Sequence, residues 1–174
     1  NVRLFNVFKW LDRDDIPDMI LEFINTENPD ILCIQEFSNS ADIDLKVYPH
    51  KFVLMEGNQI KTGQAIFSKF PIIEEGNIVF PDSNNNVVYA DIKKGKDIIR
   101  VYNMHLQSIK ISPDVNEISE NIAVIDQQKS KFLFIRISKA FKQQQEQAAI
   151  FKEHVKNCKY PIIICGDMNN SAFS

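Results

Sequence analysis

The sequence predicts an α/β fold with mixed β-sheets, and three observations support this prediction. Two short apolar runs, at residues 31–34 and 161–165, have the length of buried strands, and each leads shortly afterwards to an acidic residue. Between residues 51 and 104, strand-like stretches alternate with turn residues, which is typical of an antiparallel meander. Apolar residues at helical spacing occur before this meander and after it. Helices and strands in this order pack as the layers of an α/β protein.

The N-terminal part of the chain predicts one helix and one strand. We expect residues 2–5 to form a strand end or an extended loop. The segment Asp14–Pro17 supplies a capping residue and an early proline, and it opens a helix that ends before Asn28. The apolar face of this helix consists of Ile16, Met19, Ile20, Phe23 and Ile24. The run Ile31–Ile34 then predicts a strand that is covered on both faces.

The rest of the chain predicts a meander, a helical region and a final strand. Strands are expected at 51–55, 64–68, 77–80, 87–93 and 97–104, with turns such as 81–86 and 94–96 between them. Residues 113–158 show helical spacing around a glutamine-rich run at 142–146, which we interpret as a solvated helix face. The last strand, Pro161–Cys165, delivers residues 166–169 at its carboxyl end.

Length and composition favour a single packed domain. The 174 residues contain no linker or internal repeat, so we expect residues 1–174 to form one domain. A net charge of −3 argues against a uniformly basic surface for nucleic acid or anionic lipid, although a local basic groove is compatible with it. No apolar stretch is long enough to cross a bilayer. Cys33 and Cys165 lie in apolar runs, so we expect buried thiols rather than disulfides.

Two acidic residues, Glu36 and Asp167, follow the apolar strands and are the central candidates for chemistry. Ligand sites in α/β folds lie at the carboxyl ends of strands. Carboxylates placed there suit Mg²⁺ or Mn²⁺, which prefer oxygen ligands and leave water positions for a substrate phosphate. The alternative interpretation is that each acid only marks where its strand reaches solvent. A nucleoside-triphosphatase site is disfavoured, because the chain contains no G-x-x-x-x-G-K-[ST] motif.

Two further polar residues belong to the same candidate site. His105 follows the strand expected at 97–104 and can donate a hydrogen bond or a proton to a phosphate oxygen. Asn169 lies just after Asp167 and can bind a phosphate or a water molecule without adding negative charge. The other histidines, His50 and His154, lack such a setting, and we interpret both as structural.

Five segments of the chain match a known superfamily, and they occur in its order: Asn1-Val2, Pro29–Glu36, Gly63–Ile72, Tyr102–Leu106 and Pro161–Asn169. With these segments the sequence resembles the endonuclease/exonuclease/phosphatase superfamily, which includes deoxyribonuclease I, abasic-site endonucleases, inositol polyphosphate 5-phosphatases and neutral sphingomyelinases. The continuation Asn-Val-Arg-Leu-Phe is similar to that of bacterial members.

The resemblance implies a deoxyribonuclease I-like fold, which is a four-layer α-β-β-α sandwich with two mixed β-sheets. It also implies metal-dependent phosphoester hydrolysis of the phosphodiesterase or nuclease type, with Mg²⁺ or Mn²⁺ as cofactor. Glu36 matches the principal metal ligand, and Asp167 matches the residue that positions or deprotonates the attacking water. Asn169 matches a residue that holds the scissile phosphate, and His105 one that contacts a phosphate oxygen. Asn1 matches a metal-shell or hydrogen-bonding residue.

Two parts of this resemblance leave alternatives open. Asn6 is a rival for the role of Asn1, because its spacing to Glu36 is equally acceptable, although the residues after Asn1 favour Asn1. Members of the superfamily also end in a Ser-Asp-His-type motif, which the chain does not reach. We therefore expect an excerpt of a longer polypeptide that lacks its first strand and its C-terminal segment and is inactive by itself. The alternative is a degenerate homologue.

The resemblance leaves the substrate, the location and one rival function open. The expected partner is a phosphoester substrate, which is a small molecule, a lipid headgroup or a nucleic acid. The charge balance favours a small-molecule, lipid-headgroup or nucleotide phosphodiesterase over a processive DNA nuclease. Bacterial relatives can carry membrane-spanning segments before the first motif, so the location is cytoplasmic or membrane-associated. The rival function is a non-catalytic module that binds a phosphorylated ligand or a protein. Residues 111–136 either carry specificity or form an ordinary surface insertion.

Overall fold

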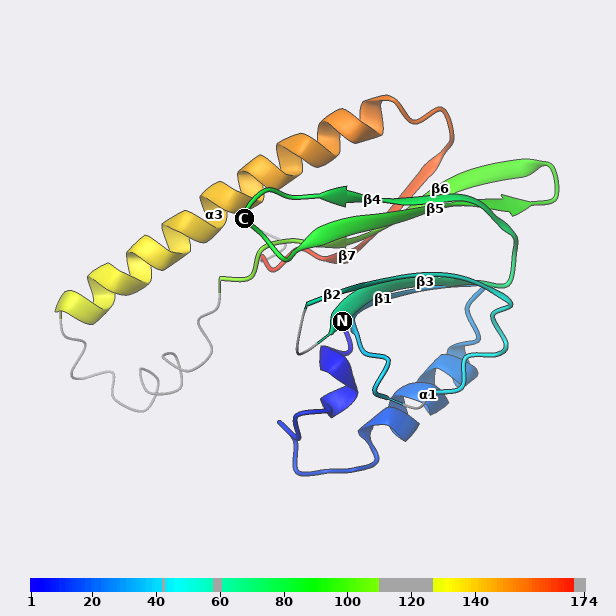
Figure 1. Cartoon of the computed structure of the whole chain (residues 1–174), viewed down its shortest axis with the longest axis horizontal. Helices are drawn as coiled ribbons and strands as arrows, with labels where there is room; N and C mark the ends of the chain where they lie inside the picture. Colours follow the sequence, from blue (N-terminus) through cyan, green and yellow to red (C-terminus); the bar gives the residue numbers. More distant parts are fainter. Residues whose placement is uncertain (42, 58–60, 110–126, 171–174) are drawn as a thin grey trace.

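Two β-sheets lie face to face and carry one helix each on their outer faces (Figure 1). The structure is a computed structural model that describes residues 1–41, 43–57, 61–109 and 127–170. The layers follow one another as helix α1, a three-stranded sheet, a four-stranded sheet and helix α3 (Figure 1). This arrangement confirms the α/β class and the four-layer α-β-β-α sandwich.

The three-stranded sheet has the strand order β1-β3-β2. It contains β1 (Ile31–Phe37), β2 (His50–Glu56) and β3 (Thr62–Ser68), and β3 pairs antiparallel with both neighbours. Helix α1 (Ile16–Glu27) covers its outer face, with Ile24 buried against the sheet. As predicted, α1 begins with an early proline, and its C-cap residue Asn28 has a left-handed backbone.

The four-stranded sheet has the strand order β4-β5-β6-β7. The strands β4 (Ile72–Val79), β5 (Asn86–Lys94) and β6 (Asp97–His105) form an antiparallel meander, and β7 (Ile162–Asp167) adds to β6 in parallel. This sheet is therefore mixed. In the described part of the three-stranded sheet, in contrast, every pairing is antiparallel, so the predicted parallel component lies in the four-stranded sheet alone.

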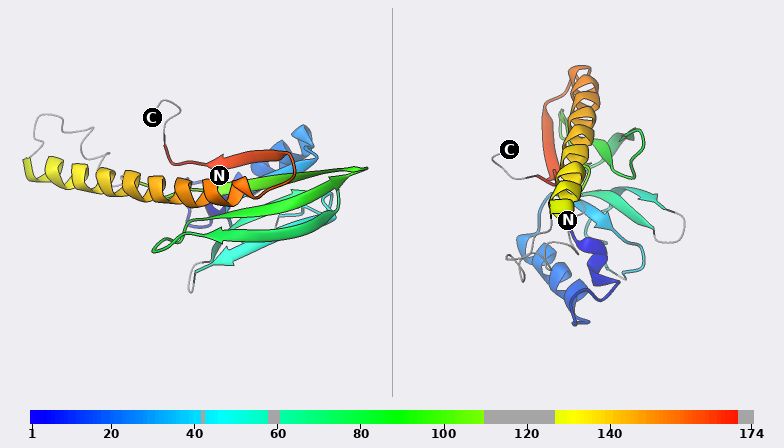
Figure 2. Two further views of the ribbon diagram at one scale, coloured as in Figure 1. Left: turned by 90° about the horizontal axis from the view of Figure 1, so that it is seen from above. Right: turned by 90° about the vertical axis from the view of Figure 1, so that its left-hand side faces the viewer.

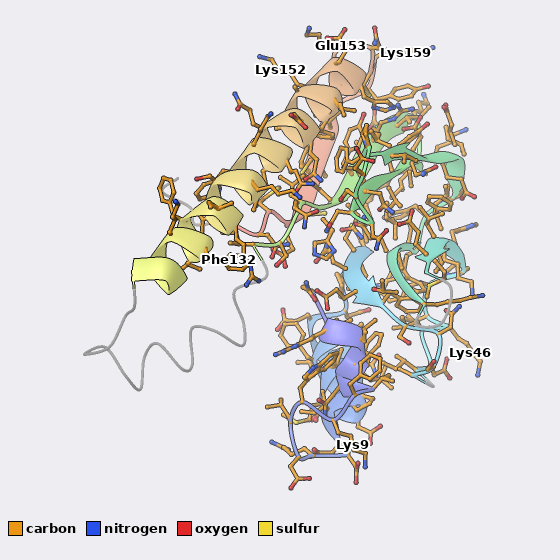
Figure 3. All side chains as sticks on the ribbon, turned by 60° about the vertical axis from the view of Figure 1, so that its left-hand side comes forward. Lys9, Lys46, Phe132, Lys152, Glu153 and Lys159 are labelled. Atoms are coloured by element: carbon orange, nitrogen blue, oxygen red, sulfur yellow. The ribbon has the colours of Figure 1, made fainter. Side chains whose placement is uncertain are left out.

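Helix α3 (Gln127–Lys156) lies on the outer face of the four-stranded sheet and extends past the edge of both sheets (Figures 1 and 2). Its C-terminal half packs on the sheet, where the rings of Phe151 and Tyr102 meet edge to face at 5.1 Å. Its first turns project outward, and the side chain of Phe132 is exposed there (Figure 3). Among the described residues, no helix has the length and apolar character needed to cross a membrane.

Residues 3–6 differ from the expected strand end or extended loop. They form a 3-10 helix, η1 (Arg3–Asn6), in which Leu4 and Phe5 both have a φ of 54°. Phe5 is almost completely buried, and its ring packs edge to face on Phe37 at 5.7 Å. Packing of these side chains under the three-stranded sheet stabilises a backbone conformation that local sequence preferences disfavour.

Burial also departs from the sequence prediction at two places. β7 is an edge strand within the described sheet, and Ile162, Ile163 and Ile164 are 37%, 48% and 43% exposed. In β1, Ile34 is buried, whereas residues 31–33 are only partly buried. The apolar runs therefore predicted these strands correctly but overestimated how completely the described residues cover them. Cys33 and Cys165 are free thiols, as expected, but both are only partly buried where they pack against the core between the sheets.

Candidate active site

Two carboxylates from different sheets meet where β1 and β7 end. The side-chain amide of Asn1 joins them, because its Nδ2 donates to Glu36 Oε1 at 3.0 Å and to Asp167 Oδ2 at 2.9 Å. His105 lies at the same place, with Nε2 4.0 Å from Glu36 Oε1. The structure thus brings together four residues that the sequence placed in one site.

A bulge in β1 aims Glu36 into this site. The pairing of β1 with β3 shifts register between Gln35 and Phe37, and Glu36 has a φ of 52°. Gln35 is buried, while the side chain of Glu36 is 31% exposed. Bulges that re-aim a side chain are common beside active sites, and a non-glycine residue in this conformation is strained.

The parallel pair β6–β7 sets His105 beside Asp167, because these two residues are partners in the register. The strands approach closely at Gly166, which has a φ of 151°. A Cβ atom at this position would lie 2.0 Å from the carbonyl oxygen of Met104. Only glycine therefore allows β7 to deliver Asp167 at this distance from β6.

Asp167 is held as a carboxylate. Partial burial is the largest single influence and raises its pKa, but hydrogen bonds from the Asn1 amide and from the backbone N–H of Asn169, with smaller electrostatic contributions, together outweigh it. The pKa of Asp167 therefore lies below its ordinary value. A charged carboxylate at this position can accept a proton from a water molecule or orient one.

His105 is held as a neutral ring. Burial is the largest influence on His105 and lowers its pKa, while the nearby carboxylates of Glu36 and Asp167 raise it; the net pKa lies below the ordinary value. Its side chain is 16% exposed, so one side of the ring is open to a bound group. A neutral imidazole can donate one hydrogen bond to a phosphate oxygen.

Asn169 and Asn6 both have their side chains engaged locally. The Nδ2 of Asn169 donates to the carbonyl of Leu106 at 2.8 Å, which fixes the turn after β7 to the segment after β6. The side chain of Asn6 bonds the backbone of Leu11 in both directions and the carbonyl of Arg13, so it closes its own loop. Asn1, and not its rival Asn6, is therefore the asparagine that contacts Glu36.

The donor set fits a hard divalent cation. Glu36 and Asp167 supply carboxylate oxygens, and magnesium is bound in proteins by one or two carboxylates together with waters and substrate phosphate. The described ranges contain no group of three His, Cys, Asp or Glu side chains arranged to hold a metal. As it stands, Asn1 directs its amide nitrogen at the carboxylates, and its Oδ1 accepts from the N–H of Arg3. These contacts match the hydrogen-bonding role expected for Asn1, and its role as a metal ligand stays a prediction.

The remaining histidines lie elsewhere. His50 begins β2, at the end of the three-stranded sheet opposite to Glu36. His154 packs from α3 onto the rings of Tyr89 and Tyr102, with Nδ1 3.2 Å from the Tyr102 hydroxyl. Neither residue contacts the carboxylates.

Sequence reasoning missed two buried amides that link the sheets behind the site. Asn103 is completely buried, and its Nδ2 donates to the carbonyls of Ile34 at 2.9 Å and Ala65 at 3.1 Å. Its Oδ1 accepts from the side chain of Gln35. The available signal was a polar residue inside each of two apolar strands, since a buried amide needs hydrogen-bond partners.

Sequence reasoning also missed two buried glutamines of α3. The sequence predicted a solvated helix face at the glutamine-rich run, but part of this face contacts the protein. Gln144 and Gln147 are 6% and 3% exposed. The Nε2 of Gln144 donates to the carbonyls of Gln107 at 2.7 Å and Asn169 at 3.2 Å, and Gln147 Oε1 accepts from the N–H of Gln107. These two glutamines connect α3 to the segments after β6 and after β7. Their three-residue spacing places them on one face of the helix, and this spacing was the available sequence signal.

Several solved structures have the same fold as this chain at sequence identities below 25%. SmcL is 20% identical with a TM-score of 0.67, over 100% of this chain and 63% of SmcL. A β-hairpin deletion mutant of beta toxin from Staphylococcus aureus is 22% identical with a TM-score of 0.64, over 100% and 65%. TDP2 from D. rerio, complexed with a single-strand DNA product, is 14% identical with a TM-score of 0.63, over 96% and 58%.

The chain thus spans less than two thirds of the length of these structures. No curated protein sequence matches it. The profile of the Endonuclease/Exonuclease/phosphatase family matches residues 10–174, which include Glu36, His105, Asp167 and Asn169. With this match over most of its length, the chain belongs to the endonuclease/exonuclease/phosphatase family.

Proposed function

We propose that this chain forms the catalytic region of a Mg²⁺-dependent phosphoester hydrolase. The observation that carries the proposal is the pair of carboxylates Glu36 and Asp167, joined by the Asn1 amide with His105 beside them. The membership of this chain in the endonuclease/exonuclease/phosphatase family supports the same activity. Among the structural neighbours, TDP2 was solved with a single-strand DNA product, which supports a phosphoester substrate for this chain without selecting its class.

Each residue of the candidate site has its own role in the proposed hydrolysis. Asp167, kept charged by its two hydrogen bonds, orients the attacking water and takes its proton. His105 donates a hydrogen bond to a non-bridging phosphate oxygen as negative charge builds up there. Asn169 holds the turn after β7 through Leu106, and in this proposal it also contacts the scissile phosphate.

Glu36 is the residue that would hold the cation, with Asn1 fixing the orientation of both carboxylates. When bound, Mg²⁺, or Mn²⁺ in its place, would supply positive charge to the phosphate oxygens and to the leaving oxygen. The strained backbone at Glu36 is consistent with this role, because such conformations persist where the surrounding structure imposes them at a functional site.

The test uses the full-length protein and hydrolysis of bis(p-nitrophenyl) phosphate with Mg²⁺. Glu36→Gln and Asp167→Asn are each expected to lower kcat/KM at least about a hundredfold, which is the usual size of such losses. Glu75→Gln, an exposed acid on β4, is the matched control and should leave turnover unchanged. Unchanged hydrolysis in Glu36→Gln would contradict the proposal. A wild-type protein that binds phosphoesters without cleaving them would instead support the non-catalytic alternative.

A further inference from the structure

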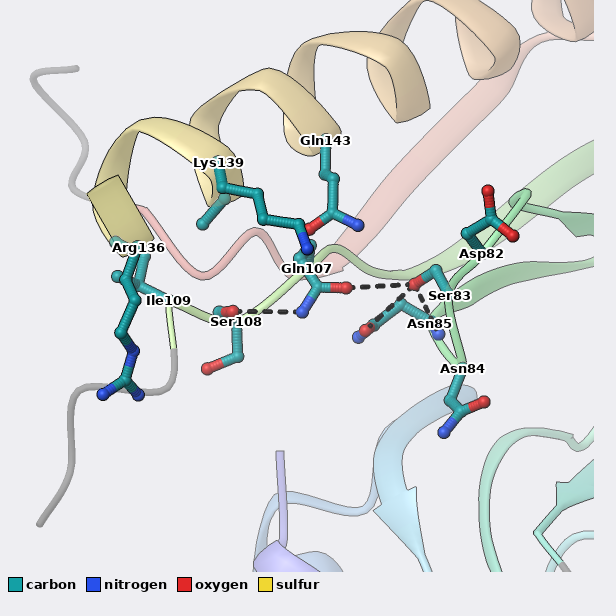
Figure 4. Close-up of a pocket in the computed structure, with 11 residues that line it drawn as sticks. Asp82, Ser83, Asn84, Asn85, Gln107, Ser108, Ile109, Arg136, Lys139 and Gln143 are labelled. Carbon is teal, nitrogen blue, oxygen red and sulfur yellow. Dashed lines mark hydrogen bonds between the residues drawn. The ribbon is translucent and has the colours of Figure 1, made fainter. Parts of the chain in front are cut away.

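A polar pocket of about 360 Å³ lies at Gln107, two residues after His105 in the chain (Figure 4). Three parts of the chain form its walls: the turn between β4 and β5, the segment after β6, and the first half of α3. Its principal side chains are Ser83, Asn85, Gln107, Lys139 and Gln143. None of these residues entered the site as the sequence predicted it.

The pocket shares a wall with the site. Asn85 lines the pocket, and its Nδ2 donates to the carbonyl of Leu106 at 3.0 Å. Asn169, in the site, donates to the same oxygen at 2.8 Å. Leu106 directly follows His105 in the chain. A ligand that reaches from His105 past the Leu106 backbone therefore enters this pocket.

Hydrogen bonds hold the pocket wall in place. The hydroxyl of Ser83 accepts from the N–H of Asn85 at 3.0 Å and from Gln147 Nε2 at 3.3 Å, and it lies 3.1 Å from Gln107 Oε1. The backbone N–H of Gln107 is fixed in turn by Gln147 Oε1 at 2.9 Å. These polar groups are therefore positioned before any ligand arrives, which lowers the entropic cost of binding.

The charge of the pocket favours an anion. Lys139 and Gln143 both extend from α3 toward Gln107, whereas Asp82 lies beyond Ser83 at the far side (Figure 4). Arg136 adds a second cation to the lining. None of the ion pairs between described residues involves Lys139, so its ammonium group is available to a ligand. An ammonium group beside amide donors suits a phosphate group.

We propose that this pocket binds a second phosphate group of the substrate, beyond the phosphate that is cleaved. The inference rests on the proposed phosphoester hydrolysis and deepens it, because it selects substrates that carry two phosphates. Lys139 supplies the charge, and the amides of Gln143 and Asn85 line the same space. The second phosphate can belong to a neighbouring nucleotide or to a phosphorylated small molecule.

The first experiment measures binding without hydrolysis. Inorganic phosphate is titrated into the ¹⁵N-labelled full-length protein, and the NMR signals of Lys139, Gln143 and the Asn85 side chain are followed. We expect saturable shifts at these groups, and about tenfold weaker binding in Lys139→Gln. Lys142→Gln, on an exposed position of the same helix outside the pocket, should behave as wild type. The absence of saturable shifts at these groups in the wild type would overturn the proposal.

The second experiment compares substrates that differ by one phosphate. The pairs are TpT with pTpT, for a nucleotide source, and inositol 1-phosphate with inositol 1,4-bisphosphate, for a small molecule. In one of the pairs the extra phosphate should raise kcat/KM about tenfold, and Lys139→Gln should abolish this preference while Lys142→Gln keeps it. If Lys139→Gln keeps the preference for the extra phosphate while Glu36→Gln is inactive, the pocket proposal is refuted and the proposed function stands. Full activity in Glu36→Gln would instead refute the proposed function, and the phosphate titration would still decide whether the pocket binds anions.

Discussion

The side-chain amide of Asn1 bridges the two carboxylates of the candidate site. Two carboxylates that lie close together repel each other, and this repulsion raises the pKa of one of them. The Nδ2 group of Asn1 donates to Glu36 Oε1 and to Asp167 Oδ2, and its hydrogen bond helps to lower the pKa of Asp167. The charge state on which the proposed chemistry depends is therefore tied to one amide.

The variant Asn1→Ala tests this dependence. Without the hydrogen bond from Asn1, the pKa of Asp167 should rise, and the acid limb of the pH–rate profile should move to higher pH. The pKa is measured from the ¹³C carboxyl signal of Asp167 in EDTA-treated buffer, with the exposed Asn25→Ala on α1 as control. An Asp167 titration that is identical in Asn1→Ala and wild type would show that the bridge does not set this pKa.

At the scale of elements, the position of Asp167 depends on how closely β7 approaches β6. The two strands are parallel neighbours, and His105 and Asp167 are opposite each other in their register. Gly166 faces the Met104 backbone with no room for a side chain, whereas Gly95 in the β5–β6 turn has open space around it. Both glycines have a positive φ, of 151° and 64°.

Replacing each glycine by alanine separates crowding from backbone strain. Gly95→Ala should cost about 1–2 kcal/mol, the usual cost of a left-handed conformation in a residue with a side chain. Gly166→Ala should cost about 1–3 kcal/mol more, because β7 must also move away from β6. Urea denaturation measures both, and only Gly166→Ala should lower kcat. If Gly95→Ala and Gly166→Ala lost the same stability, the close approach of β7 to β6 would add no cost of its own, which would contradict this prediction.

The helices and strands were the part of this fold that the sequence predicted best. Strand-like composition and turn residues placed β5 and β6 within a few residues, because both strands end at polar turns. The same rules missed η1, since its left-handed backbone depends on the burial of Phe5 in a distant part of the core. They also could not tell which glutamines of α3 face the protein, because that depends on where the turn after β7 lies.

The candidate site was predictable in its membership but not in its contacts. Glu36, His105 and Asp167 follow strands, so their position at strand ends could be inferred from the sequence. The bulge that turns Glu36 and the amide bridge from Asn1 arise only when both sheets are in place. The pocket near Lys139 has the same origin, because three distant segments form it.

For the molecule as a whole, the site exists only while the two sheets keep their relative position. Glu36 belongs to the three-stranded sheet and Asp167 to the four-stranded sheet. Apolar side chains fill most of the space between the sheets, and such packing is not directional. The buried amides of Asn103 and Gln35, and of Gln64 and Asn86, add directional hydrogen bonds across this interface. We infer that these bonds fix the register of one sheet on the other.

Asn103→Leu removes these bonds while nearly preserving volume. It removes one hydrogen bond from each of the carbonyls of Ile34 and Ala65 and takes the Asn103 acceptor away from the amide of Gln35, and a buried group left unpaired costs about 1–3 kcal/mol. We expect the free energy of unfolding, measured with urea, to fall by at least about 2 kcal/mol, since relaxation recovers part of this cost. The exposed Asn77→Leu on β4 is the control and should change it by less than about 0.5 kcal/mol. In NMR spectra of Asn103→Leu under native conditions, signals from both Glu36 and Asp167 should shift. If Asn103→Leu were as stable as wild type, apolar packing alone would hold the two carboxylates together.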